Sequence, residues 1–169
     1  MAERQQGAGT PIPFTRRLVG SEAFLTLFRE GMTLVEETAD YLDGDGRAES
    51  RRLSRVGALA YATESMRLTT RLMQVASWLL LQRAVNDGEM SAERANAEKS
   101  KVKLTGLATA TEGAGWDALP ATLQDLIVRS LRLQARVRRL EAGEGEAVGD
   151  NPVARQIGAI ERAFAIAGK

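Results

Sequence analysis

The chain has 169 residues, and its 23 lysines and arginines nearly balance its 22 aspartates and glutamates, so no global basic field favours nucleic acid. It has no cysteine and no histidine, which excludes disulfides and thiolate metal sites and removes the commonest metal ligand and general base. No apolar run approaches the roughly 20 residues that a membrane span needs, and the composition is typical of a cytoplasmic domain.

Residues 1–20 are predicted to form a flexible leader, because Pro11 and Pro13 oppose helix formation. A first helix begins near Ser21, a good N-cap residue. It ends at the glycine-rich turn of residues 43–46. Its predicted core stripe consists of Phe24, Leu27, Phe28, Val35, Ala39 and Leu42.

The longest predicted helix covers Leu59 to Asp87 and carries two apolar stripes. The first stripe repeats every seven residues and consists of Leu59, Met66, Met73 and Leu80. The second stripe is rotated away from it and consists of Tyr61, Leu68, Leu72, Val75 and Leu79. A helix with two apolar stripes has two apolar neighbours. We expect the second stripe to be the interface for self-association or for a partner; the alternative is that both stripes belong to the core.

A short accessory helix from Ser91 to about Lys101 is predicted to be exposed and weakly held. Thr105 to Leu119 is predicted to form a loop with Trp116 as its anchor. The third long helix begins at Pro120, which suits a first helical turn. Its predicted core stripe consists of Leu123, Leu126, Ile127, Leu133, Val137 and Leu140.

Arginines line the opposite face of the third helix, at Arg129, Arg132, Arg136 and Arg139. One interpretation is a solvated face, since positive charge near a helix C-terminus is favourable. The other is a docking face for an acidic protein. Nucleic acid is the weaker option, because no aromatic side chains accompany the arginines.

The C-terminal region contains a linker rich in glycine and acidic residues, residues 142–152, and a short amphipathic segment, residues 153–167. The apolar residues of this segment have helical spacing and are Val153, Ile157, Ile160 and Phe164. Because so short a helix is unstable alone, we expect the segment to fold only against its own bundle or a partner.

The predicted fold is therefore all-α: a helical bundle domain over residues 21–141, with three long helices, a long central one among them, a short accessory helix and flexible termini. No residue is predicted to be catalytic, to bind a cofactor or to bind a metal. A nucleophilic enzyme needs a base to activate its nucleophile, and the usual base, histidine, is absent. No glycine-rich phosphate loop occurs. We expect a protein that is not an enzyme.

Two runs in the longest helix, residues 64–74 (ESMRLTTRLMQ) and 76–85 (ASWLLLQRAV), resemble the RcdA family, the regulators of CtrA degradation of alphaproteobacteria. Supporting segments are residues 28–32 (FREGM), 36–44 (EETADYLDG), 88–91 (GEMS) and 150–157 (DNPVARQI). The resemblance extends from about Ser21 to Phe164. It implies a three-helix bundle that tends to form a homodimer.

The resemblance also implies a non-catalytic adaptor. Such an adaptor helps to deliver cell-cycle transcription regulators to the ClpXP protease, which is primed by the response regulator CpdR, and one route passes through the cyclic-di-GMP-binding protein PopA. The expected partners are ClpX with a CpdR-like response regulator, a PopA-like protein, cargo regulators and a second copy of the chain. These partners would concentrate a cytoplasmic protein at a cell pole. The alternative function is a DNA-associated helical regulator that uses the arginine face.

Overall fold

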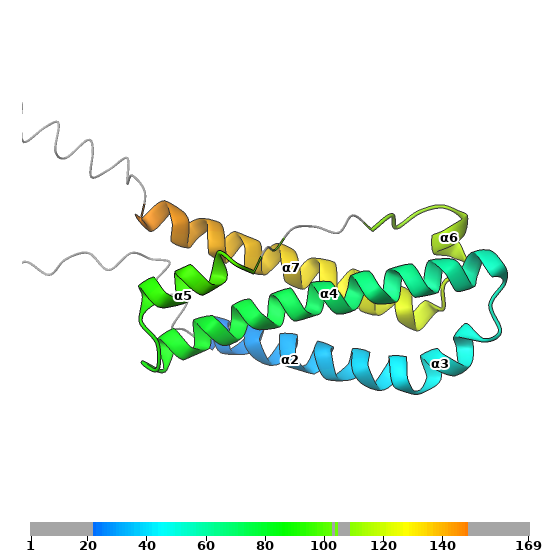
Figure 1. Ribbon diagram of the computed structural model, residues 1–169, viewed down its shortest axis with the longest axis horizontal. Helices are drawn as coiled ribbons and strands as arrows, with labels where there is room; N and C mark the ends of the chain where they lie inside the picture. Colours follow the sequence, from blue (N-terminus) through cyan, green and yellow to red (C-terminus); the bar gives the residue numbers. More distant parts are fainter. Residues whose placement is uncertain (1–21, 103, 105–108, 149–169) are drawn as a thin grey trace, which may run out of the picture.

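The structure, a computed structural model, describes residues 22–102, 104 and 109–148 (Figure 1). Three long helices form a bundle: α2 (Glu22–Asp43), α4 (Arg55–Asn86) and α7 (Ala121–Val148). Three short helices accompany them: α3 (Asp45–Ser50), α5 (Ala92–Lys99) and α6 (Ala114–Asp117). The described ranges contain no strand, and the predicted all-α bundle with a long central helix is confirmed.

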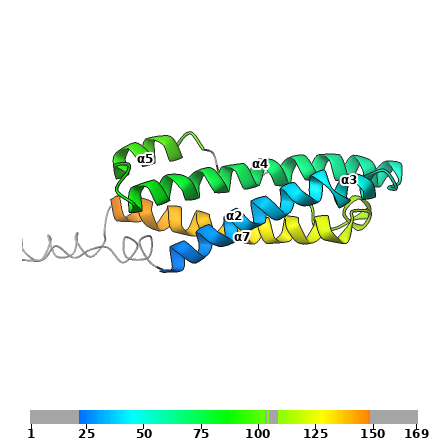
Figure 2. The ribbon, with the colours of Figure 1, turned by 90° about the horizontal axis from the view of Figure 1, so that it is seen from below.

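The central helix α4 packs against α2, α7, α5 and α6. Figure 1 shows α3 and α6 at one end of the bundle and α5 at the other. Both α4 and α7 run from the first end to the second, antiparallel to α2, and Figure 2 shows α2 crossing them at an angle. The chain therefore returns along the length of the bundle between α4 and α7.

Local signals account for the ends of α4. The side chain of Ser54 accepts a hydrogen bond from the backbone N–H of Gly57 at 3.2 Å, which caps the first turn. After Asp87, the helix stops at Gly88, whose φ of 75° favours glycine. Ser91 caps α5 in the same way as Ser54, by accepting from Arg94 N–H at 3.3 Å. The predicted cap of α2, Ser21, lies outside the described residues.

The core lies between α2, α4 and α7. The predicted stripe of α7 is confirmed, with Leu140 only partly buried. The predicted stripe of α2 is correct over its first half; in its second half Val35 and Leu42 are only partly buried against the core and Ala39 is exposed. There the buried residues are Leu34, Thr38 and Tyr41, one residue before the predicted ones. Thr38 lies at the seven-residue spacing that starts at Phe24 and Gly31, and Leu34 and Tyr41 lie at the spacing that starts at Leu27. The predicted residues continued the row from Phe28 instead, at the edge of the buried face.

The accessory helix α5 exposes Glu93, Arg94, Asn96 and Ala97, as predicted, but the prediction that it is weakly held is wrong. Ala95 and Lys99 are buried. The Lys99 ammonium lies 4.3 Å from the centre of the Trp78 ring and donates a hydrogen bond to Gln82 Oε1, both on α4. A lysine can bury its aliphatic stem and place its charge over an aromatic face, and this contact fixes α5 to α4.

Two further segments differ from their predicted limits. Within the predicted loop, residues 114–117 form the single turn α6, and the Trp116 carbonyl accepts a hydrogen bond from Gln124 Nε2 at 2.7 Å. The helix α7 continues to Val148, into the range predicted as a linker. Ala142 and Ala147 are strong helix formers, which offsets the cost of the glycines in this stretch.

Gly46 provides a test of packing at the end of the bundle. A Cβ at this position would lie 2.7 Å from both the Tyr41 carbonyl oxygen and the Tyr61 hydroxyl. Gly46→Ala should lower the free energy of unfolding by about 1–3 kcal/mol, because the backbone must shift. Urea denaturation measures this change. The matched control is Gly115→Ala, whose Cβ would make an ordinary 3.7 Å contact with Ala60; an equal loss in both variants would contradict the packing argument.

Candidate functional site

The first stripe of α4 lies on the surface of the bundle. The exposed fractions are 72% for Leu59, 70% for Met66, 66% for Met73 and 53% for Leu80. These four residues, called here the exposed stripe, are among the largest exposed apolar side chains of the described residues. Single exposed apolar residues are normal, but a row of four on one helix marks a candidate interaction surface.

No charge interrupts the exposed stripe. Ala62 and Thr69 lie between its large side chains and are exposed, and Ala76 is half-buried. At 1.5 Å per residue the stripe extends over about 32 Å. Its apolar side chains alternate with small ones, so the backbone of another helix can approach closely.

The second stripe, predicted to be the partner or dimer interface, lies inside the bundle. Leu68, Leu72, Val75 and Leu79 are buried, and Tyr61 is packed partly buried against the same core. The predicted assignment of the two stripes is therefore reversed: this stripe contacts α2 and α7, and the surface open to a partner is the exposed stripe.

The density of the two stripes explains this reversal. The second stripe has a large apolar residue on nearly every turn and continues through Trp78, which is fully buried. The exposed stripe has one large residue every two turns. A core face needs a continuous apolar surface, so stripe density is the sequence signal that distinguishes them.

A buried polar network lies beside the core. Arg71 of α4 is 1% exposed. Its guanidinium donates to Ser130 Oγ of α7 at 2.9 Å and to Thr109 Oγ1 at 2.8 Å. Thr109 donates in turn to Glu64 Oε2 at 3.1 Å, and Glu64 Oε1 pairs with Arg67 at 2.6 Å. The network joins α4, α7 and the segment that leads into α6.

The charged guanidinium of Arg71 is buried away from solvent. Burial lowers the pKa of its guanidinium, and the carboxylate of Glu64 opposes that shift. An arginine stays protonated in proteins, so this positive charge must be solvated by polar groups of the chain itself. The network is therefore better explained as structural support than as a site of acid–base chemistry.

A groove opens between α4 and the segment around α6. It is lined by Val56, Leu59 and Thr63 from α4 and by Gly113 and Trp116 from the facing segment, among others. Leu59 belongs to both the groove and the exposed stripe, so the two surfaces are continuous. Thr109, held by Arg71 and Glu64, fixes the start of the segment that forms the far wall.

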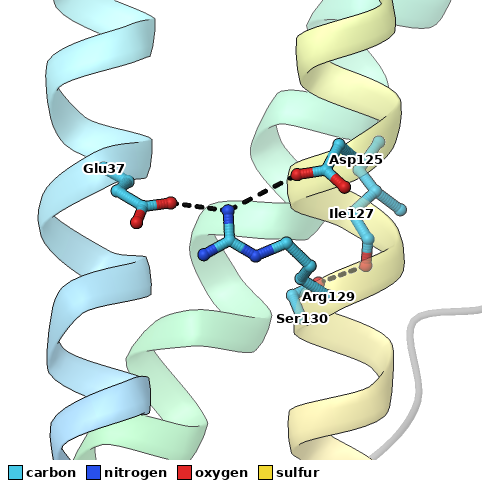
Figure 3. Close-up of polar contacts among 5 residues, drawn as sticks. All are labelled: Glu37, Asp125, Ile127, Arg129 and Ser130. Carbon is cyan, nitrogen blue, oxygen red and sulfur yellow. Dashed lines mark hydrogen bonds and ion pairs between the residues drawn. The ribbon is translucent and has the colours of Figure 1, made fainter.

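The arginines of α7 do not form one free face. Arg129 pairs with Glu37 of α2 at 2.6 Å and with Asp125 at 3.4 Å (Figure 3). The hydrogen bond to Glu37 raises the pKa of Arg129, so the pair favours the charged form. Arg136 pairs with Glu30 of α2 at 2.5 Å.

The remaining two predicted docking arginines, Arg132 and Arg139, are exposed. Half of the predicted arginine face therefore contacts α2, where its charge is partly neutralised. This arrangement weakens the interpretation of the face as a surface for nucleic acid, whose phosphates require accessible positive charge.

The predicted docking residues of the tail, Val153, Ile157, Ile160 and Phe164, lie outside the described residues. Within the described part of the chain, no group of three or more His, Cys, Asp or Glu residues is placed to hold a metal ion. In the same ranges, no helix combines the length and the apolar character needed to cross a membrane.

Comparison with known proteins now identifies the family. Residues 15–164 match the family described as "Protein of unknown function (DUF1465)". Among solved structures, the crystal structure of RcdA from Caulobacter crescentus CB15 is 56% identical, covers 77% of this chain and 94% of that chain, and superimposes with a TM-score of 0.61. The chain belongs to the RcdA family. A comparison with curated proteins gives no match.

Membership of the RcdA family confirms the resemblance drawn from residues 64–74 and 76–85. Both runs lie on α4, and they include residues of the buried face as well as Met66, Met73 and Leu80 of the exposed stripe. The segment that identifies the RcdA family in this chain is thus also the segment that presents its most exposed apolar surface.

Thr109 tests whether the buried network holds the segment before α6. Thr109→Val keeps the shape of the side chain but removes the hydroxyl that bridges Arg71 and Glu64. The free energy of unfolding should therefore fall by about 1–3 kcal/mol. Amide hydrogen exchange over residues 110–118 should also accelerate. Thr111→Val, which removes an exposed hydroxyl, is the control. If both variants exchange alike, the network does not hold this segment.

Proposed function

We propose that this chain is a non-catalytic adaptor of regulated proteolysis, which binds other proteins through the exposed stripe of α4. The observation that carries the proposal is the row of four large apolar side chains, each more than half exposed, on a helix whose opposite face is the core. Membership of the RcdA family supports the same function.

The geometry of the stripe suits a protein ligand. Small-molecule sites are concave and enclose most of their ligand. The stripe instead lies along a single convex helix, and an amphipathic helix or an extended segment can bury it along its length. The DNA-associated alternative has no comparable support, because Arg129 and Arg136 pair with carboxylates of α2.

The family resemblance supplies the partners of this proposal. The adaptor delivers cell-cycle transcription regulators to the ClpXP protease with the help of a CpdR-like response regulator, and a PopA-like protein connects it to cyclic-di-GMP. It forms a homodimer and acts in the cytoplasm, concentrated at a cell pole by its partners. Arg132 and Arg139 provide exposed charge for an acidic partner.

Neighbouring residues of α4 test the docking surface. Met73→Glu places a charge on the exposed stripe and should change the free energy of unfolding by no more than about 0.5 kcal/mol, as surface substitutions usually do. The same variant should lose capture of ClpX, the CpdR-like protein or cargo from an extract of the source organism. Mass spectrometry of the captured proteins and urea denaturation provide the two measurements.

Leu72→Glu is the matched control, because it introduces the same side chain one position earlier, in the core. Leu72→Glu should lower the free energy of unfolding by more than about 4 kcal/mol and so unfold the bundle. Reconstituted degradation of a captured cargo by ClpXP then tests delivery itself. The proposal fails if Met73→Glu captures and delivers cargo as well as the original chain does.

A further inference from the structure

Four exposed arginines lie where α3 ends and α4 begins. They are called here the arginine corner and are Arg47, Arg51, Arg52 and Arg55. None of them forms an ion pair with another described residue. Glu49, which lies among them in the sequence, accepts a hydrogen bond from the Tyr41 hydroxyl at 2.7 Å instead. The four positive charges are therefore open to a ligand.

The position of these charges opposes the start of α4. The N-terminus of a helix carries the positive end of its dipole, so acidic residues are favoured in the first turn. The first turn of α4 has no acidic residue and begins with Arg55. Arg51 and Arg52 add two more positive charges just before it. Residues that break a local rule without a compensating contact are typical of functional surfaces. The arginine corner is therefore better explained as a binding surface than as support for the fold.

The groove between α4 and the segment around α6 begins beside the arginine corner. Figure 1 shows α6 and the connection from α3 to α4 at the same end of the bundle. Val56 directly follows Arg55, lines the groove and is 58% exposed. Trp116, on the facing wall, is half-buried. From Val56 to Glu64 the groove extends about 12 Å along α4, which is enough for about four residues of an extended segment.

The far end of the groove carries the opposite charge. Glu64 and Glu112 belong to its lining, and Glu112 lies in the segment between Thr109 and α6, on the side of Glu64. The Glu64 carboxylate is bonded to Arg67 and Thr109. Glu112 is exposed and forms no ion pair with a described residue. A ligand with carboxylates is therefore attracted to the arginine corner and repelled from the far end.

We propose that the arginine corner and the groove together bind an acidic segment of another protein. Carboxylates of the segment contact the arginines, and an apolar side chain next to them enters the groove between Val56 and Trp116. A nucleic acid fits less well, because it carries phosphates along its whole length and those over the groove would face Glu112. This second docking surface goes beyond the proposed function, which uses the exposed stripe; the two surfaces share Leu59.

Fluorescence anisotropy with the full chain tests this surface. The probe is a fluorescein-labelled peptide of three glutamates followed by a phenylalanine. It should bind saturably, and binding should weaken as salt rises, because ions screen exposed charges. A peptide with glutamines in place of the glutamates, and one with alanine in place of the phenylalanine, should each bind at least about fivefold more weakly. An absence of saturable binding up to about 1 mM of the chain, or equal binding of all three peptides, overturns the proposal.

Charge reversal locates the binding surface. Arg51→Glu/Arg55→Glu should weaken binding of the acidic peptide by at least about tenfold. Because this variant places acidic residues at the start of α4, its thermal unfolding should not move to lower temperature. Arg29→Glu/Arg94→Glu is the matched control, since it changes the net charge equally at two exposed arginines outside the corner. It should bind the peptide nearly as the original chain does. An equal loss in both variants would show that only net charge matters and would overturn the proposal.

Further measurements distinguish other occupants of the arginine corner. A short DNA duplex that binds more tightly than the peptide, through the same two arginines, would assign the corner to nucleic acid. A loss of self-association in Arg51→Glu/Arg55→Glu by sedimentation would assign it to a second copy of the chain. Either result overturns the proposal.

The exposed stripe is tested separately. Met73→Glu should bind the acidic peptide as the original chain does, whatever its effect on delivery, so the two docking surfaces can fail independently. A loss of peptide binding in Met73→Glu would mean that the arginine corner is no separate surface, and would overturn the proposal.

Discussion

The fold depends on the burial of one face of α4 between α2 and α7. The helix is 32 residues long, and its buried face is continuous from Leu68 through Trp78 and Leu79. The hydrophobic effect acts most strongly on that face, and the short helices α5 and α6 cover further parts of α4. Leu59, Met66, Met73 and Leu80 lie outside this buried face, and the proposed docking of another protein is the role that we assign to them.

Polar contacts hold α5 and the segment before α6 in position along α4. Arg71 and Lys99 each bring a charge into a largely buried position, where hydroxyl, amide or aromatic groups surround it. Such a charge is costly to bury without partners, so the partners must stay in place. Thr109 ahead of α6 and the whole of α5 are thereby fixed along α4. These polar contacts act together with the burial of Ala95, Leu104 and Leu119 to position the connection between the second and third long helices.

Sequence reasoning captured the helices and their main limits, because helical periodicity and caps such as Ser54 are local properties. It also placed the chain in the RcdA family. It reversed the roles of the two stripes of α4, since periodicity shows that a helix has two apolar faces but not which face meets the core. Contacts between residues far apart in the chain, such as Arg71 with Ser130 and Arg129 with Glu37, leave no local pattern and were not predicted.

The parallel direction of α4 and α7 bears on how the bundle folds. The helices α2 and α4 are joined through the short α3 and meet as neighbours in sequence, so their contacts close small loops. The contacts of α7 with α4 require the chain to travel back along the bundle first, which costs more loop-closure entropy. We expect the α2–α4 hairpin to form early and α7 to dock late. The contact order of this small helical protein is thus raised by a single crossover, the one that also carries α5 and α6.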